Sequence, residues 1–386
     1  MEYSVDNKRI VTNTLFLYAR TILVLLVALY TARILLNELG VEDYGVYNVV
    51  GSVVILFSFL NTAMTQAAQR FITFELGVGD HIMIKKVFSM VVNTQCIIML
   101  LIIILAETIG LWFLNFRLNI PIDRVVAANI VYQISLLTFA VNVLKVPYEA
   151  AIIAHEKMNF FAYVSIIDAV LKLAITILLT IIIFDKLIAY AVFLLVATFI
   201  IFFIYLCYCY KNISTCKYIK VWDKNLFRKL FSFSGWSLCG SSTDLLTQKG
   251  FVFLLNIFSG IASNAALGIA NQVSGALRTF INSFQTAFKP QIVKSYASND
   301  MIRFCYLILE TSKFSFMLII LPILFIVLNM PLLLEIWLGS VPEYAVKFCQ
   351  LMAICGVFDA LTGSFYCAIL SSEKTKSAQK IKLIVI

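Results

Sequence analysis

Long apolar segments separated by short polar loops cover almost the whole chain. Runs such as Cys96–Ala106, Ala174–Phe184 and Leu187–Leu206, with their flanks, are long enough to cross the ~30 Å hydrocarbon core of a bilayer as helices. The pattern predicts ten complete membrane-spanning helices and the start of an eleventh at Ile381. Their expected bounds are 10–36, 44–69, 87–115, 125–153, 160–184, 187–210, 230–258, 265–288, 304–329 and 348–370.

Composition agrees with an all-α, polytopic membrane protein. The chain has 386 residues, of which 61% are hydrophobic and only 13% are charged, too few polar residues to cover a soluble domain of this size. The first apolar stretch, Ile10–Leu36, is longer than the core of a signal peptide, and no small-residue cleavage site follows it. We therefore expect it to be retained as a signal anchor.

Lysine and arginine gather in alternate loops. The loops on one side hold most of them, whereas the loops on the other side hold only Arg117, Arg124, Lys186 and Lys347, and the loop 37–43 is acidic. By the positive-inside rule the N-terminus is cytoplasmic. The net charge of +9 is thus mainly a topology signal, to which attraction for anionic lipid headgroups adds, and we expect no nucleic-acid partner.

An internal repeat divides the chain. Phe59–Asp80 recurs about half a chain later as Phe280–Asp300, with Phe, Asn, Ser/Thr and Thr at matching offsets. The repeat predicts two lobes of six helices in parallel orientation, with the second lobe incomplete. We expect the first lobe at 1–215, a basic cytoplasmic linker at 216–229 and the second lobe at 230–386. The repeated segments lie at the cytoplasmic mouth, so Arg70 and Lys289 are candidates for an inner gate, or else ordinary positive-inside loop residues.

Charged residues inside the spans are the candidates for function, because charges in lipid are costly and usually face a bundle interior or a water-filled cavity. Three nearby pairs, Lys145/Glu149, Asp168/Lys172 and Glu310/Lys313, are expected to neutralise themselves. The cations that remain are Arg20, Arg33, Lys249 and Arg278, and the remaining acids are Glu107, Asp244 and Asp359. A cavity with an excess of cations suits an anionic substrate such as a diphosphate.

No ATP-binding or hydrolase motif occurs, so energy would come from an ion gradient or from removal of product. Asp168, Asp244 and Asp359 are the candidates for carrying Na+ or H+, and Asp359 is expected to have a cation partner on another helix. The cysteines form no CxxC pair and both histidines fall in loops, so we expect no metal site, no cofactor and no catalytic residue.

The N-terminal region resembles a known family. The run NTLFLYARTILVLLVALYTARILLNELGVEDYGVYNVV, the segment QAAQRFITFELG and the later FSFSGW resemble bacterial O-antigen and polysaccharide flippases (Wzx-type) of the MOP superfamily, which includes the MATE exporters. The resemblance implies two lobes around a cationic cavity, alternating access, and a lipid-linked oligosaccharide diphosphate as cargo in the bacterial inner membrane. Arg20, Arg33, Lys249 and Arg278 correspond by helix position and charge, and other polysaccharide-assembly membrane proteins are implied partners.

Relatives in that family have at least twelve helices, whereas this chain stops at KIKLIVI, so we expect a second lobe that lacks two helices. Three alternatives stay open. A MATE-like, ion-coupled exporter of cationic drugs should have a more acidic cavity. A membrane enzyme of glycan assembly should have a long outward loop, and the outward loops here are short. An inactive, truncated remnant is the third.

Overall fold

The structure is a computed structural model of the chain. It describes the backbone of residues 2–55, 58–116, 122–338, 341, 344–372 and 375–385. The side chains of 2–15, 51–55, 58–63, 241–265 and 382–385, and of a few single positions elsewhere, lie outside the description. All secondary structure in the described part is helical, which confirms the predicted fold class.

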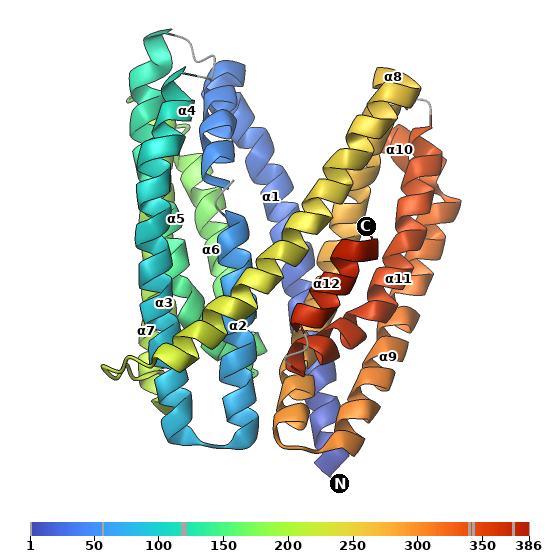
Figure 1. Ribbon diagram of the computed structural model, residues 1–386. Coiled ribbons are helices and arrows are strands. Elements are labelled where there is room, and N and C mark those ends of the chain that lie inside the picture. The colour runs from blue at the N-terminus through green and yellow to red at the C-terminus, as the bar shows by residue number, and fades with distance from the viewer. Residues whose placement is uncertain are drawn as a thin grey trace. The chain divides into compact units, whose positions relative to one another are not determined.

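The helices follow one another with short connections (Figure 1). In chain order they are α1 (Glu2–Ile55), α2 (Ser58–Val78), α3 (His81–Leu105), η1 (Ala106–Gly110), α4 (Leu111–Phe116), η2 (Ile122–Arg124), α5 (Val125–Ala154), α6 (Met158–Leu178), α7 (Lys186–Asn212), η3 (Ser214–Cys216), α8 (Lys224–Ala297), α9 (Met301–Leu328), α10 (Met330–Leu338), α11 (Ala345–Ser371) and α12 (Thr375–Val385).

Two of these helices contain more than one predicted span. In α1 the break falls at Gly40, whose φ of 74° and ψ of 172° are open to glycine but strained for other residues. The helix before it contains the first predicted span, and the second predicted span is covered by the rest of α1 and by α2. In α8 the ribbon rises and then folds back, so that the spans predicted at 230–258 and 265–288 are its two arms (Figure 1).

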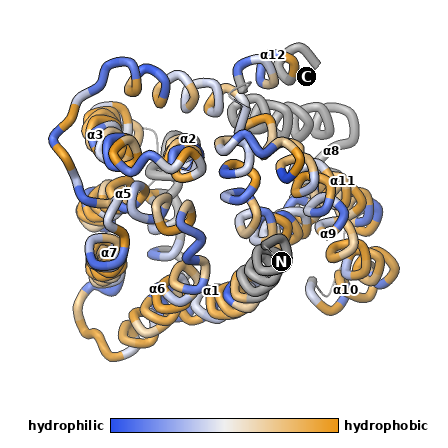
Figure 2. Tube along the Cα trace, turned by 90° about the horizontal axis from the view of Figure 1, so that it is seen from below, coloured by the Kyte–Doolittle hydropathy of each residue, from blue (hydrophilic) through white to orange (hydrophobic). Residues whose placement is uncertain are grey.

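Seven helical segments are long and apolar enough to cross a membrane, counted over the described residues alone. They are Phe16–Gly40, His81–Asn115, Val125–Ala154, Met158–Leu178, Lys186–Asn212, Met301–Leu328 and Ala345–Ser371. Hydrophobic residues follow α6, α7, α9 and α10 (Figure 2), and large apolar side chains such as Phe203 on α7 and Leu321 on α9 are exposed. Exposed apolar surface on long helices is what a bilayer accommodates, so the chain is a multi-pass membrane protein.

The chain forms two compact units. One, the N-terminal unit, is Ile22–Ser234, and the other, the C-terminal unit, is Gly235–Ile386 together with Met1–Thr21. The start of α1 therefore belongs with the second half of the sequence, whereas the sequence-based lobes kept 1–215 together. The lobe boundaries derived from the sequence stay a prediction.

Each unit has its own core. In the N-terminal unit Leu35, Val50, Tyr132 and Leu187 come together from α1, α5 and α7. The Tyr132 hydroxyl donates a 2.8 Å hydrogen bond to the Ala106 carbonyl. Ala106 begins the π-helical turn η1, where the regular α-helical hydrogen-bond pattern is interrupted. In the C-terminal unit the core gathers residues of α8, α9 and α11, namely Leu277, Ile281, Ile319, Ile323, Ala353, Val357 and Ala360.

The internal repeat is visible in the turns. Gly79 has a φ of 85° and Asn299 a φ of 59°, and each is followed by an aspartate that caps the next helix. The Asp80 carboxylate accepts from the amides of Ile82 and Met83, and Asp300 accepts from the amide of Arg303. The second span was predicted to end at residue 69, whereas the helix α2 continues to Val78.

Candidate functional site

The start of α1 crosses α8 inside the C-terminal unit, next to two of the predicted cations. The rings of Tyr18 and Phe280 lie 5.7 Å apart, and the hydroxyls of Thr21 and Ser283 share a 2.7 Å hydrogen bond. Arg20 lies between Tyr18 and Thr21, and its side chain is half-buried. Because Arg278 precedes Phe280 by two residues, both arginines lie within about one turn of this crossing.

Arg278 forms an ion pair with Asp359 of α11. Its Nε donates to Asp359 Oδ2 at 3.1 Å, and the two side chains are 50% and 44% exposed. The sequence assigned Arg278 to substrate and Asp359 to a coupling ion, and it predicted a cation partner for Asp359 on another helix. The predicted cation partner of Asp359 is confirmed as Arg278. The binding and coupling roles of the two residues stay predictions.

Neighbouring polar groups hold the backbone of α11 around this pair. The Gln285 amide of α8 donates to the Asp359 carbonyl at 3.4 Å, and the Ser312 hydroxyl of α9 donates to the Leu361 carbonyl at 2.8 Å. Both donors are buried. Two helices therefore fix the position of Asp359, and through its carboxylate the Arg278 guanidinium is held in place.

Three further residues were predicted to line the cavity or to carry an ion: Arg33, Lys249 and Asp244. Arg33 is exposed on α1 in the N-terminal unit. Asp244 and Lys249 lie on α8, but their side chains fall outside the described residues. A cavity that includes Arg33, Lys249 or Asp244 stays a prediction.

Two of the local pairs expected from the sequence form. Lys172 Nζ lies 2.8 Å from Asp168 Oδ2 on α6, and Lys145 Nζ lies 3.9 Å from Glu149 Oε2 on α5. Glu310 and Lys313, both described, have no ion pair between them; Lys313 is exposed whereas Glu310 is partly buried. Asp168 is thus already neutralised on its own helix.

The two inner-gate candidates differ in their surroundings. Arg70 is 4% exposed, and its guanidinium carbon lies 4.6 Å from the ring centre of Phe71 and 4.8 Å from that of Phe74. Phe233, at the start of α8, adds a third ring at 5.9 Å. Lys289 lies in the C-terminal unit, where its carbonyl accepts a weak hydrogen bond from Cys367 Sγ at 3.9 Å. A gating role for either residue stays a prediction.

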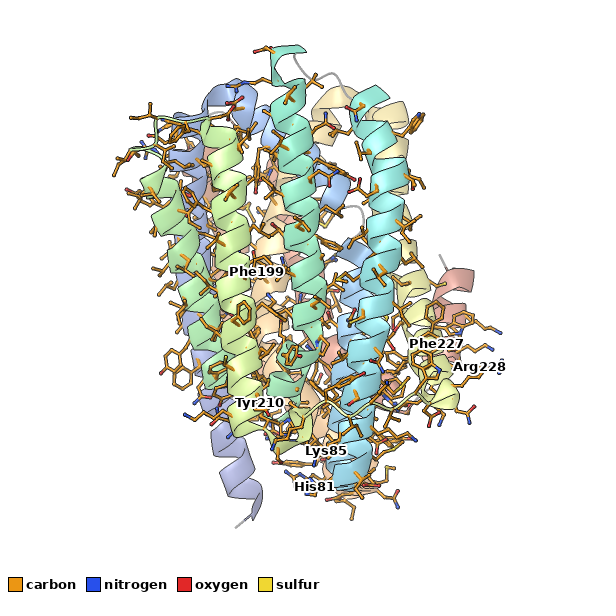
Figure 3. All side chains as sticks on the ribbon, turned by 90° about the vertical axis from the view of Figure 1, so that its left-hand side faces the viewer. His81, Lys85, Phe199, Tyr210, Phe227 and Arg228 are labelled. Carbon is orange, nitrogen blue, oxygen red and sulfur yellow. The ribbon has the colours of Figure 1, made fainter. Side chains whose placement is uncertain are left out.

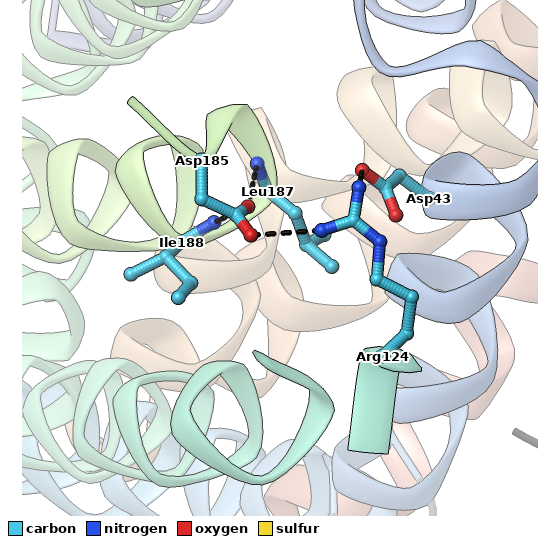
Figure 4. Close-up of polar contacts among 5 residues, drawn as sticks. All are labelled: Asp43, Arg124, Asp185, Leu187 and Ile188. Atoms are coloured by element: carbon cyan, nitrogen blue, oxygen red, sulfur yellow. Dashed lines mark hydrogen bonds and ion pairs between the residues drawn. The ribbon is translucent and has the colours of Figure 1, made fainter. Parts of the chain in front are cut away.

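A charged network at the opposite end of the N-terminal unit was not recognised in the sequence (Figure 4). Arg124 bridges two acids: Nη2 lies 2.8 Å from Asp43 Oδ2, and Nη1 lies 2.8 Å from Asp185 Oδ2. Asp185 also caps α7, since its Oδ1 accepts from the amides of Leu187 and Ile188. Lys186 pairs with Glu38 at 2.8 Å. The network ties together α1, α5 and α7.

Loop charge could have predicted this network. The acidic loop after the first span and the scarce cations Arg124 and Lys186 lie on the same predicted side of the membrane. Opposite charges on one side, with few partners to choose from, point to pairing. The sequence reading used these residues only as a count for topology.

The fold is that of MATE-like transporters of the MOP superfamily. A crystal structure of MATE in complex with MaD3S superposes with a TM-score of 0.83 at 13% identity, over 97% of this chain and 84% of that one. An outward-facing multidrug resistance MATE family transporter gives a TM-score of 0.78 at 14% identity, over 97% and 85% of the two chains. A MOP superfamily transporter from Pyrococcus furiosus, described as having a binding pocket of reverse polarity, gives 0.76 at 13% identity, over 95% and 84%.

Sequence comparison places the chain more narrowly. Residues 10–296 match the family described as polysaccharide biosynthesis protein, so the chain belongs to that family. No curated protein matches the sequence.

Proposed function

We propose that this protein is a flippase that moves an undecaprenyl diphosphate-linked oligosaccharide from the cytoplasmic to the periplasmic leaflet of the bacterial inner membrane. The product would serve the assembly of O-antigen or another surface polysaccharide. Membership of the polysaccharide biosynthesis family and a transporter fold support this proposal. The basic loops favour a cytoplasmic N-terminus.

The geometry of Arg278 carries the proposal. Asp359 is the one carboxylate paired with Arg278 in the described part of the chain, and it engages Nε. Both terminal amino groups of the guanidinium therefore remain for a second anion, and a phosphate matches their fork in a bidentate contact. Arg20, within about one turn of the same crossing, supplies a second cation for a diphosphate.

In the proposed cycle the diphosphate binds at this crossing while the lipid tail stays in the bilayer. The lobes then rock so that access changes from one side to the other, with Arg70 and Lys289 at the inner mouth. A proton or Na+ that neutralises Asp359 would release Arg278 from its partner, which couples ion binding to substrate binding. Asp168 and Asp244 remain the other candidates for coupling, although the Lys172 contact makes Asp168 the weaker of them.

The fold alone does not identify the substrate, because proteins of this fold differ in the polarity of the binding pocket: one solved relative is described as having a pocket of reverse polarity. A MATE-like exporter of cationic drugs is the second candidate, and the acid at the crossing, Asp359, is the observation that favours it. A membrane enzyme of glycan assembly and an inactive remnant are weaker alternatives.

Complementation of a strain that lacks the gene tests the proposal. Arg278→Gln should reduce surface polysaccharide about tenfold or more, since a hydrogen-bonded charge contact contributes ~1.5–3 kcal/mol. Arg278→Lys should be intermediate, and Lys347→Gln, at an exposed lysine at the start of α11, should export normally. A normal amount of surface polysaccharide with Arg278→Gln would show that Arg278 does not bind the substrate. Sensitivity to cationic drugs with unchanged polysaccharide would favour the exporter, and failure of the unmodified chain to complement would favour the remnant.

A further inference from the structure

The segment that connects the two halves of the sequence is fastened to α3. The amide of Ile219 donates to Ser89 Oγ at 2.9 Å, and Asn93 Nδ2 donates to the Val221 carbonyl at 3.2 Å. The Tyr218 hydroxyl donates to Asn93 Oδ1 at 3.0 Å. This segment was predicted as a linker, and in the structure it follows a defined path along the N-terminal unit (Figure 3).

Aromatic rings form a continuous row where this segment enters α8. The ring centres of Trp222 and Phe227 are 5.1 Å apart, and those of Phe227 and Phe231 are 5.9 Å apart. The side of α8 that faces the unit is occupied by Leu226 and Leu230, which are buried. Trp222 and Phe231, however, are each 57% exposed. The row therefore lies on the outside of the unit.

Basic side chains flank this row. Lys220, Lys224 and Arg228 are exposed, and Lys224 and Arg228 are four residues apart, so they share a helical stripe beside that of Phe227 and Phe231. Figure 3 shows Phe227 and Arg228 together on the outside of the N-terminal unit. We call these residues the linker surface: Lys220, Trp222, Lys224, Phe227, Arg228 and Phe231.

The one acidic residue in 211–234 does not oppose this charge. Asp223 is paired with Lys86 of α3, with Oδ2 2.7 Å from Nζ. Its other oxygen caps α8 by accepting from the amides of Asn225 and Leu226. The charge of Asp223 is thus directed inward, toward α3 and the start of α8.

The depth of the linker surface follows from the length of the helix beneath it. The apolar segment His81–Asn115 has 35 residues, or ~52 Å at 1.5 Å per residue, against ~30 Å for the hydrocarbon core. Its ends therefore extend into the headgroup layers. The linker is fastened between Lys86 and Asn93, close to the first end. A bilayer centred on this segment would therefore have its membrane–water interface at the level of the row of rings.

We propose that the linker surface binds anionic phospholipid headgroups of the leaflet next to it. Lys220, Lys224 and Arg228 pair with lipid phosphates, and the three rings occupy the boundary between headgroups and acyl chains, where aromatic residues are favoured. These lipids surround the protein and are distinct from a transported substrate. The inference therefore stands whether or not the proposed function does.

Bromine-labelled lipids test this proposal on the full chain in vesicles. Replacement of Trp112, Trp236 and Trp337 by Phe leaves Trp222 as the single tryptophan of the four. We expect its fluorescence to be quenched most by lipid brominated near the headgroup. At equal mole fraction, brominated phosphatidylglycerol should quench more than brominated phosphatidylcholine, with a relative affinity of about threefold or more.

The triple variant Lys220→Gln/Lys224→Gln/Arg228→Gln should bring that ratio to about one, as should molar salt, because both remove the electrostatic attraction. Lys347→Gln, an exposed lysine at the start of α11, is the matched control and should leave the ratio unchanged. Quenching of the Trp222 fluorescence by aqueous acrylamide but not by brominated lipid would overturn the proposal, because the linker surface would then lie in water. Protection of Trp222 from both quenchers would also overturn it, in favour of a protein partner. A ratio that the triple variant does not change would overturn it as well.

Discussion

Removal of Arg124 should destabilise the N-terminal unit more than removal of any surface ion pair. Arg124→Met keeps most of the side-chain volume but leaves the carboxylates of Asp43 and Asp185 without their cation. The Asp43 side chain is only 10% exposed, so its charge would be poorly hydrated. Asp185 is 31% exposed and retains its cap hydrogen bonds to α7, so its loss is smaller.

The magnitude lies between two limits. Breaking a fully buried pair costs ~3–5 kcal/mol, and breaking an exposed pair costs ~0–1 kcal/mol. Because Arg124 is 32% exposed and Asp43 is nearly buried, we expect about 2–3 kcal/mol. For a unit of this size, ~2–4 °C per kcal/mol corresponds to a fall in Tm of about 4–12 °C.

Thermal unfolding in detergent, followed with a thiol-reactive fluorogenic dye, measures this fall because Cys209 and Cys216 are buried in the same unit. Lys172→Met is the matched control, since it breaks a pair of the same length whose partners are 47% and 34% exposed. It should lower Tm by no more than ~4 °C. Asp43→Asn combined with Arg124→Met should recover most of the loss by removing the buried charge. Equal effects of Arg124→Met and Lys172→Met, or no recovery in the double variant, would refute the reasoning.

Two further predictions concern the linker and the kink of α1. The contact with Lys86 and the amides of α8 lower the pKa of Asp223 from 3.8 to about 2. The depressed pKa means that the stabilisation of the linker is complete above about pH 4 and is lost as pH falls toward 2. Pepsin should therefore spare the linker at pH 4 and cleave near Tyr218 at pH 2, and Lys86→Met should allow cleavage at pH 4; equal cleavage of both proteins at pH 4 would contradict this. Gly40→Ala should cost ~1–3 kcal/mol, because alanine is strained at this φ and ψ, whereas Gly235→Ala, with open space around its Cβ, should leave Tm unchanged or higher.

Local signals in the sequence predicted the helices and the pairs within one helix. Apolar length identified the spans, and spacings of four residues identified the Asp168–Lys172 and Lys145–Glu149 pairs. The ends of the helices were harder to predict. The second span was predicted to end at residue 69, whereas α2 continues to Val78. Arg70, the first residue beyond the predicted end, is buried with its guanidinium over aromatic rings, an environment in which a cation needs little water.

Contacts between helices required an argument about charge balance. Asp359 has no opposite charge near it in the sequence, and this isolation correctly predicted a partner on another helix, although it did not identify Arg278. The same reasoning, applied to the acidic loop 37–43, would have paired Asp43 with Arg124, because few cations exist on that side. The assignment of the start of α1 to the C-terminal unit had no such signal, since Tyr18–Phe280 and Thr21–Ser283 join uncharged residues.

The Arg278–Asp359 pair bears on the excess of cations from which an anionic substrate was predicted. The pair carries no net charge, so a bound anion must be held by the hydrogen-bonding groups of Arg278 and not by charge alone. Asp359 engages Nε, which leaves the terminal amino groups for the proposed diphosphate. Each of them would donate to a phosphate oxygen in a bidentate contact. The fork of the guanidinium therefore supports the proposed substrate more than the count of charges does.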